Sequence, residues 1–248
     1  MSYIKNGAID QASMGSTRLP GKVLRHILGK PMMWYLVECL KKSQFINEII
    51  IATTAEEADN SIIALAQRCK VKSFSGSEED VLDRFFQASK RNKLKVIVRI
   101  CSDCPLLTTE VIDKVIKYYL DHKEDLDYVS NFLKPSYPLG LGVEVFSTET
   151  LERCWAEAKE PYQREHVTAY IYEHPNLFRL GNVRYNRDLS HLRLTVDTKE
   201  DLRFVREVYL RLYKDGRHFS MGDILNLFKK EPKLLKINSH IKQKGLRD

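Results

Sequence analysis

The sequence predicts an α/β fold in three layers, with a mainly parallel central sheet between two layers of helices. Apolar runs of strand length alternate with amphipathic segments of helix length, a pattern typical of βαβ units. The 248 residues suit one large α/β domain, and 43% hydrophobic residues are enough for a full core. Neither an internal repeat nor a low-complexity linker divides the sequence. We therefore expect a single domain over residues 1–248, with a small arm over 133–190.

The strands are predicted from short apolar runs, and the helices from amphipathic segments with capping residues. Strands are expected at residues 3–9, 48–53, 71–74, 95–100, 127–131 and 192–197. Helices are expected from Pro31 through Leu40, at 59–69, 109–122 and 148–158, and after Thr198. The first strand is the weakest prediction, because Asn6 and Gly7 interrupt it and Asp10 stands at its end.

The loop that follows the first strand, residues 11–22, is too rich in small residues to belong to the core. Its glycines let the backbone approach a ligand closely, and Arg18 and Lys22 bring positive charge to it. Backbone N–H groups with a nearby lysine, after the first strand of an α/β unit, are typical of a phosphate-binding loop. It is not a Walker A loop, because Val23 follows Lys22 where that motif has Ser or Thr. The alternative is a flexible surface loop with incidental charges.

A second candidate lies at residues 75–84, where a tight turn opens onto a helix. A Ser or Asp before an acidic first turn is an N-cap pattern, which could explain half of the run. Capping does not require Asp83 or Arg84. A ligand-binding role therefore remains open beside the structural one.

The strand at 95–100 is the most strand-like run in the chain and should be central. Asp103 follows it, and ligands of open α/β sheets bind at the carboxyl ends of strands, so we expect chemistry there. Cys101 and Cys104 form a C-x-x-C pair that leaves a redox role open. A zinc site is disfavoured because no second cysteine pair or histidine cluster accompanies them.

The second half of the chain offers further candidates. Glu144 lies in an alternating run that could present it to a substrate, and Arg164 with His166 suits an anionic ligand. A lone helical histidine is more often structural. Asp197 ends the last expected strand, and Thr198 after it is the expected helix N-cap. Asp197 is therefore either part of that cap or a functional carboxylate.

Several runs together resemble the cytidylyltransferases of spore-coat and surface polysaccharides, relatives of the CMP-KDO and CMP-acylneuraminate synthetases. These runs are QASMGSTRLPGK from residue 11, GSEEDVLDR from 76, RICSDCPL from 99, YPLGLGVEVF from 137, PYQREHVTAYIY from 161 and INSHIKQK from 237. The chain departs from the family pattern at Ser13, where relatives carry Arg, and at Leu139 and Gly142, where they tend to carry Asp. Asp10 stands where relatives are apolar.

The resemblance implies a Rossmann-like nucleotidyltransferase fold and a CTP-dependent enzyme. Such an enzyme activates a sugar or sugar acid as its CMP derivative for surface polysaccharide and releases pyrophosphate. It further implies Mg²⁺ held by Asp103 and Asp197, a homodimer formed through 133–190, and an anionic sugar-type acceptor bound by Glu144, Arg164 and His166. Lys22, Arg18 and Asp103 would be catalytic. Nucleotide-binding residues would be Gln11, Ala12, Ser13, Gly15, Arg18, Lys22, Ser75, Gly76 and Asp83.

Two alternatives remain beside this activity. The departures at positions 10, 13, 139 and 142 leave open a nucleotide-binding pseudoenzyme or partner subunit with weakened CTP binding. A glycosyltransferase of related fold would need a D-x-D metal motif at a strand end, and Asp103-Cys104-Pro105 is not one.

Composition argues against other classes of partner. The net charge of +7 comes from Lys and Arg spread among acids, and the basic C-terminal cluster from Lys229 to Arg247 is better read as a solvated tail than as an RNA-binding surface. No apolar run approaches the roughly 18 residues of a transmembrane helix, and residues 1–6 lack a signal-peptide core. Five cysteines without paired spacing suggest reduced thiols. We expect a cytoplasmic protein without a nucleic-acid or membrane partner.

Overall fold

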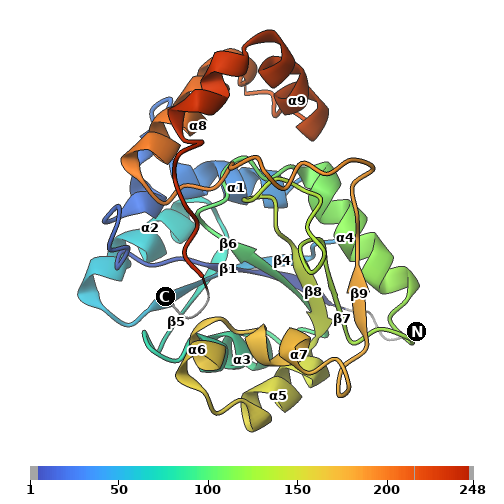
Figure 1. Ribbon diagram of the computed structural model, residues 1–248. Coiled ribbons are helices and arrows are strands. Elements are labelled where there is room, and N and C mark those ends of the chain that lie inside the picture. The colour runs from blue at the N-terminus through green and yellow to red at the C-terminus, as the bar shows by residue number, and fades with distance from the viewer. Residues whose placement is uncertain (1–4, 215, 246–248) are drawn as a thin grey trace.

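The computed structural model describes residues 5–214 and 216–245, which form a seven-stranded sheet covered by helices on both faces (Figure 1). The strand order is β5-β4-β1-β6-β8-β7-β9, and only β8 runs antiparallel to its neighbours. The strands are β1 (Asn6–Gln11), β4 (Glu48–Thr54), β5 (Lys72–Gly76), β6 (Val96–Cys101), β7 (Tyr128–Ser130), β8 (Glu144–Ser147) and β9 (Leu180–Asn182). A separate hairpin pairs β2 (His26–Ile27) with β3 (Lys30–Pro31). The predicted three-layer, mainly parallel fold is confirmed.

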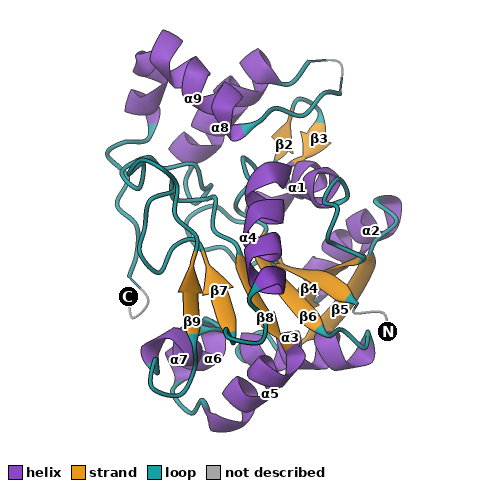
Figure 2. Ribbon diagram, turned by 90° about the vertical axis from the view of Figure 1, so that its right-hand side faces the viewer, coloured by secondary structure: helices purple, strands orange, loops and turns teal. Residues whose placement is uncertain are grey.

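The helices form two layers that bury different faces of the sheet (Figure 2). One face is covered by α1 (Met32–Leu40), α2 (Asn60–Arg68) and α4 (Thr109–Asp121), with α8 (Lys199–Leu212) and α9 (Met221–Lys230) stacked outside them. The other is covered by α3 (Val81–Arg91), α5 (Thr148–Glu157), α6 (Pro161–Glu165) and α7 (Ala169–Glu173). Short 3₁₀ turns complete the chain at η1 (Lys22–Leu24), η2 (Glu57–Asp59) and η3 (Pro232–Ile237).

The expected arm at 133–190 is continuous with the body of the fold. It supplies β8 and β9 of the central sheet, and its helices α5–α7 belong to the layer that also contains α3. A role of this segment in dimerisation stays a prediction.

The prediction of a strand at 192–197 is wrong. This segment is extended, but its only ladder contact among the described residues is an isolated bridge between Leu139 and Arg193. The backbone N–H of Leu194 donates to the carbonyl of Leu139 at 2.7 Å, and that of Val196 donates to the carbonyl of Asp103 at 2.8 Å. Its neighbours are thus loops rather than a strand, so no pairing continues beyond one or two residues.

The expectation that Asn6 and Gly7 interrupt the first strand is also wrong. Both lie in β1, which sits in the middle of the sheet between β4 and β6. Gly7 is required there, because a Cβ would come within 2.4 Å of the Leu94 side chain. The Asn6 side-chain NH₂ group donates to the carbonyl of Phe45 at 3.0 Å, and its backbone N–H donates to Asn47 Oδ1 at 2.9 Å. Residues 3 and 4 of the expected strand lie outside the described residues, as does Arg247 of the basic tail.

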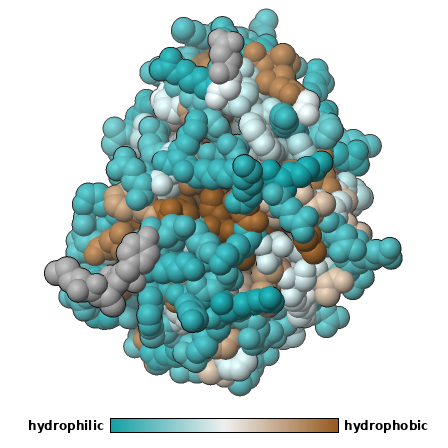
Figure 3. All heavy atoms as spheres, turned by 180° about the vertical axis from the view of Figure 1, so that it is seen from behind, coloured by the Kyte–Doolittle hydropathy of each residue, from teal (hydrophilic) through white to brown (hydrophobic). Residues whose placement is uncertain are grey.

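The face of the molecule seen from behind is largely hydrophilic, with an apolar patch at its centre (Figure 3). Among the described residues, no helix has the length and apolar character needed to cross a membrane.

A fully buried carboxyl group, that of Asp10, lies within β1 at the edge that carries the catalytic candidates. Ser102 donates its hydroxyl to Asp10 Oδ2 at 2.6 Å, whereas Oδ1 has no partner in the described part of the chain. Burial raises the pKa of Asp10 to about 8, and the charge of Asp103 adds to the rise while the Ser102 hydrogen bond opposes it. The carboxyl is therefore protonated at neutral pH.

This pKa predicts a pH-dependent stability. Between its ordinary pKa of 3.8 and about 8, the folded state holds a proton that the unfolded state lacks, so stability falls as pH rises through this window. Asp10→Asn removes the titration, so the variant does not lose this stability as the pH rises. The difference in free energy of unfolding, Asp10→Asn minus wild type, should therefore increase by at least about 1.4 kcal/mol from pH 5 to pH 8. Urea unfolding at the two pH values measures this increase. Parallel pH profiles for the two proteins would contradict it.

Candidate active site

The loop between β1 and η1 is held in one conformation by its own contacts. The backbone N–H of Met14 donates to Asp59 Oδ1 at 2.8 Å, and that of Gly21 donates to the carbonyl of Met14 at 3.2 Å. Gly21 adopts the left-handed region with φ of 65°, which favours glycine and closes the loop. Asp59 is itself fixed by the hydroxyls of Thr53 and Thr54. The loop is thus an ordered element rather than a flexible surface segment.

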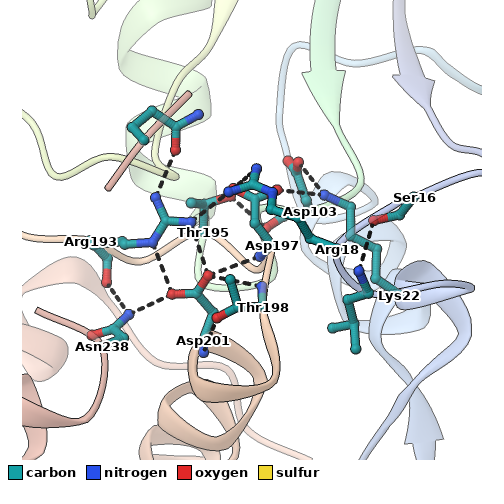
Figure 4. Close-up of polar contacts among 12 residues, drawn as sticks. Ser16, Arg18, Lys22, Asp103, Arg193, Thr195, Asp197, Thr198, Asp201 and Asn238 are labelled. Carbon is teal, nitrogen blue, oxygen red and sulfur yellow. Dashed lines mark hydrogen bonds and ion pairs between the residues drawn. The ribbon is translucent and has the colours of Figure 1, made fainter. Parts of the chain in front are cut away.

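At the end of this loop, Lys22 lies between two carboxylates. Its Nζ is 2.8 Å from Asp103 Oδ2 and 2.8 Å from Asp197 Oδ1 (Figure 4). Arg18 extends the cluster, with Nη2 at 3.2 Å from Asp197 Oδ2. The structure therefore brings together the four charged residues singled out as catalytic and metal-binding candidates. We call Arg18, Lys22, Asp103 and Asp197 the charge cluster.

The charge cluster fixes the ionisation of its members. Burial disfavours the ammonium of Lys22, but the two carboxylates outweigh burial and raise its pKa above the usual value. Burial alone would raise the pKa of Asp197, yet Lys22, Arg18 and Arg193 together lower it. The charged forms of Lys22 and Asp197 therefore stabilise each other.

Asp197 is held by a buried network that the sequence analysis did not single out. Arg193 donates to Asp197 Oδ2 at 2.8 Å and to both oxygens of Asp201 at 2.9 Å. Asp201 forms a capping box with Thr198 at the start of α8 and accepts from the backbone N–H of Asp197 at 3.0 Å. The helix cap is thus Thr198, and the Asp197 carboxylate is left to face Lys22. The Thr198–Asp201 spacing could have signalled this capping box.

The C-terminal segment completes this network. Asn238 donates to Asp201 Oδ1 at 2.9 Å and to the carbonyl of Arg193 at 3.1 Å. Gln243 accepts from Arg193 Nη1 at 2.6 Å. Figure 1 shows the chain returning from α9 toward the edge of the sheet to make these contacts. No pattern in the sequence links positions 193, 201 and 238.

A cavity of about 480 Å³ adjoins the loop at the carboxyl ends of β1 and β4. It is lined by Gln11, Ser13, Gly15, Thr54, Glu78, Glu79, Val81, Arg84, Pro161 and Glu165. The loops at 11–22 and 75–84 therefore border one space, as the sequence suggested. Ala12, in contrast, is buried in the core, and Ser75 and Gly76 end β5.

Asp83, a predicted nucleotide ligand, is engaged elsewhere. It accepts from Trp155 Nε1 at 2.8 Å and from Gln87 at 3.1 Å, which ties α3 to α5. Its neighbour Arg84 does reach the cavity, as Glu78, Glu79 and Val81 do, and none of these was among the predicted site residues.

Arg84 is only 2% exposed, and Gly76 leaves room for it, since a Cβ there would lie 3.0 Å from Arg84 Cγ. Its Nη1 donates to the carbonyl of Ser77 at 2.8 Å, while Nε has no partner among the described residues. Burial lowers the pKa of this guanidinium, although Asp59 and Glu78 partly offset the effect. A buried donor without a partner at a cavity wall is a candidate ligand contact. The only sequence signal for it was that capping does not explain this position.

The predicted acceptor-binding residues have partners within the protein. Glu144 is 3% exposed, pairs with Arg99 and accepts from Tyr128 at 2.7 Å. Arg164 pairs with Asp80 at 2.6 Å, and its Nη1 donates to the carbonyl of Trp155 at 2.8 Å. Within the described residues, neither Glu144 nor Arg164 forms a hydrogen bond or ion pair with the charge cluster.

His166 lies at the turn after α6, where its backbone N–H donates to the carbonyl of Tyr162 at 2.9 Å. Substrate contact by Glu144, Arg164 and His166 stays a prediction.

The C-x-x-C pair gives no support to redox or zinc chemistry. Cys101 and Cys104 are free thiols, and burial raises the pKa of Cys101 to about 12 and that of Cys104 well above its ordinary value. Thiolates, the reactive and metal-binding form, are therefore disfavoured at both positions. No cluster of three or more His, Cys, Asp or Glu that could hold a metal occurs in the described ranges.

Comparison with known proteins places the chain in one family. The family model described as Cytidylyltransferase matches residues 8–237. An uncharacterized protein of Methanocaldococcus jannaschii is 43% identical over 244 residues, which are 97% of each chain. The spore coat polysaccharide biosynthesis protein SpsF of Bacillus subtilis is 34% identical over 231 residues, 90% of this chain and 94% of that protein.

A solved structure agrees with this assignment. The cytidylyltransferase from Leptospira borgpetersenii superposes with a TM-score of 0.90 at 29% identity, covering 98% of this chain and all of that one. None of these similarities supports the pseudoenzyme alternative. The chain belongs to the cytidylyltransferase family of nucleotidyltransferase enzymes.

Proposed function

We propose that this enzyme uses CTP to convert a sugar or sugar acid into its CMP derivative for surface polysaccharide biosynthesis, with release of pyrophosphate. The observation that carries the proposal is the charge cluster beside the cavity, in which Lys22 bridges Asp103 and Asp197. The five cysteines are free thiols, which supports a cytoplasmic location.

The two halves of the site suit different parts of CTP. The cavity is lined by Glu78, Glu79 and Glu165, which would repel a triphosphate, so this space suits the base. Arg18 and Lys22 lie on the same loop as the cavity residue Gly15 and would neutralise the triphosphate. An acceptor oxygen would then attack the α-phosphorus in line, and catalysis would consist of positioning and charge neutralisation.

The residues of the charge cluster also fit Mg²⁺. Asp103 and Asp197 already share one cation, the ammonium of Lys22, so their oxygens converge on a position of positive charge. Two carboxylates, completed by phosphate oxygens and water, are the donors that Mg²⁺ prefers. When bound, the ion would neutralise phosphate charge. Lys22 could exchange its carboxylate contacts for contacts with phosphate.

The acceptor side favours an anionic sugar. Leu139 and Gly142 stand where the family tends to carry acids, so two carboxylates that would repel an anion are missing. Leu139 is 37% exposed and Phe132, which packs against Gly142, is 39% exposed. The segment from 132 to 142 therefore offers a partly apolar surface without an acidic residue, and its exposed Lys134 adds a positive charge.

Pyrophosphate release with each of the four nucleoside triphosphates, Mg²⁺ and a panel of sugar acids tests this function. Release that requires CTP and one sugar acid supports the proposal. Absence of release with every pair, in a protein that binds CTP, would instead favour a nucleotide-binding role without turnover.

The first prediction from this site concerns Asp103 and Asp197. Asp103→Asn or Asp197→Asn keeps the shape of the side chain but removes a charge that offsets dehydration of the ion. Turnover should fall at least about a hundredfold, or roughly 2.7 kcal/mol. Steady-state rates as a function of Mg²⁺ concentration measure the loss, and Asp121→Asn on the exposed side of α4 is the matched control. An unchanged Mg²⁺ dependence in Asp103→Asn would remove this residue from the proposed metal site.

A second prediction concerns Ser13, which lines the cavity where relatives carry Arg. Ser13→Arg should tighten CTP binding roughly ten- to hundredfold, because a charge-assisted contact to phosphate contributes on the order of 1.5–3 kcal/mol. Calorimetry with CTP and Mg²⁺ measures the affinity. Thr17→Arg adds the same charge to an exposed position of the same loop and controls for long-range attraction. Equal affinities of wild type and Ser13→Arg would mean that the loop serves another ligand geometry.

A third prediction concerns assembly through 133–190. Most aromatic side chains of this segment pack inside the protomer, as Tyr137 and Phe178 do, but Leu139 and Leu177 remain exposed. We expect a second copy to contact this segment, giving a homodimer with twice the chain mass of 28.9 kDa. Light scattering at micromolar concentration measures the mass. A mass near 28.9 kDa at every concentration would rule the dimer out.

A further inference from the structure

We infer that Gln11 recognises the cytosine ring of the nucleotide, and that Arg99 orients its amide for this purpose. The inference rests on the proposed use of CTP and identifies how the site selects that base. It starts from two charged residues, Arg99 and Glu144, that pair with each other inside the sheet.

Arg99 and Glu144 form an ion pair inside the sheet. They lie opposite each other on the neighbouring strands β6 and β8, and Arg99 Nη1 donates to Glu144 Oε2. The other carboxylate oxygen, Oε1, accepts from Tyr128 at 2.7 Å and from the hydroxyl of Thr168. Glu144 is thus saturated with donors, and the guanidinium of Arg99 is held in one place. Because a buried ion pair is seldom needed for stability, its role lies in what Arg99 contacts next.

That next contact is Gln11, the last residue of β1. Arg99 Nη2 donates to Gln11 Oε1 at 3.3 Å. A guanidinium has no acceptor, so the carbonyl oxygen of the Gln11 amide must face Arg99 and the NH₂ group must face away from it. In the described parts of the chain no protein acceptor is recorded for this NH₂ group, and Gln11 lines the cavity. The cavity therefore receives a hydrogen-bond donor of fixed orientation.

A fixed donor discriminates between the two pyrimidines. Cytosine has an unprotonated ring nitrogen, N3, that accepts a hydrogen bond, whereas the same position in uracil is an N–H donor. The Gln11 NH₂ group therefore matches cytosine and opposes uracil. The glutamates on the cavity wall, Glu78 and Glu79, add to this preference, because they can accept from the amino group that cytosine alone carries.

Arg99 is accordingly a positioning residue, and Glu144 acts through it. Without Arg99 the Gln11 amide could rotate by 180° and present its oxygen, which would accept from uracil. The ion pair thus determines whether the NH₂ group or the oxygen of the Gln11 amide faces the base. The interior position of Glu144 follows from this role.

The test is calorimetry of the full chain with CTP and with UTP, each with Mg²⁺, on the wild type, Gln11→Glu and Gln11→Met. Glutamate has the shape of glutamine but no donor. Gln11→Glu should therefore lose at least about tenfold in CTP affinity and gain in UTP affinity. Gln11→Met should lose the preference for CTP without acquiring one for UTP. Gln67→Glu, on the exposed face of α2, makes the same charge change away from the cavity and should leave both affinities unchanged.

The role of Arg99 is tested by the double variant Arg99→Met, Glu144→Met, which removes both charges and leaves no unpaired ion. Its ratio of CTP to UTP affinity should fall at least about tenfold while its melting temperature shows that it is folded. If the double variant does not fold, an isosteric Glu144→Gln exchange, which weakens the hold on Arg99, should lower the same ratio. A folded variant with the wild-type ratio would overturn the positioning role.

The outcomes separate this inference from the function on which it rests. A wild-type protein that fails to bind CTP would refute the proposed function itself. A wild type that prefers CTP, with the same CTP-to-UTP ratio in Gln11→Glu, would overturn only the assignment of Gln11.

Discussion

The bridge that Lys22 makes between Asp103 and Asp197 is the contact on which the rest of the site depends. Three distant parts of the chain meet there: the loop after β1, the turn after β6 and the segment before α8. Two carboxylates at one position would repel each other, and the ammonium between them removes that cost. The protein thereby holds acidic side chains close together without a ligand. In the proposed function the same groups offer oxygens to a cation and a positive charge to phosphate.

Buried polar side chains near the site form two networks. One joins Asp197 to Arg193 and Asp201 and holds the carboxylate of Asp197. The other joins Glu144 through Arg99 to Gln11, and we infer that it orients the Gln11 amide toward the base of the proposed nucleotide. In each network an arginine connects a carboxylate that accepts several hydrogen bonds with a side chain assigned to ligand binding in the proposed function. Polar networks of this kind restrict the rotation of their side chains, which suits the proposed reaction because it relies on positioning.

The sequence predicted the layers, most strands and the loops that meet at the site, because apolar periodicity and turn residues report on local structure. It also indicated that Asp103 and Asp197 lie together. It could not show that Gly7 continues a strand, because that depends on Leu94, 87 positions away. Nor could the sequence show that Glu144 and Arg164 are paired within the protein, because a charged residue gives the same sequence signal whether its partner is a ligand or another side chain. In the structure Glu144 pairs with Arg99, and Arg164 pairs with Asp80. Arg84 was missed because a capping motif does not show which of its neighbouring side chains is buried at a cavity wall.

The contacts of Asn238 and Gln243 have a consequence for the order in which this part of the fold can form. A chain is synthesised from its N-terminus, so the sheet and the loop at 11–22 can form before residues 238 and 243 emerge. Until then Arg193 and Asp201 pair with each other and with Asp197, but they lack the contacts of Asn238 and Gln243. The network behind Asp197 is therefore completed after its immediate partners have been synthesised.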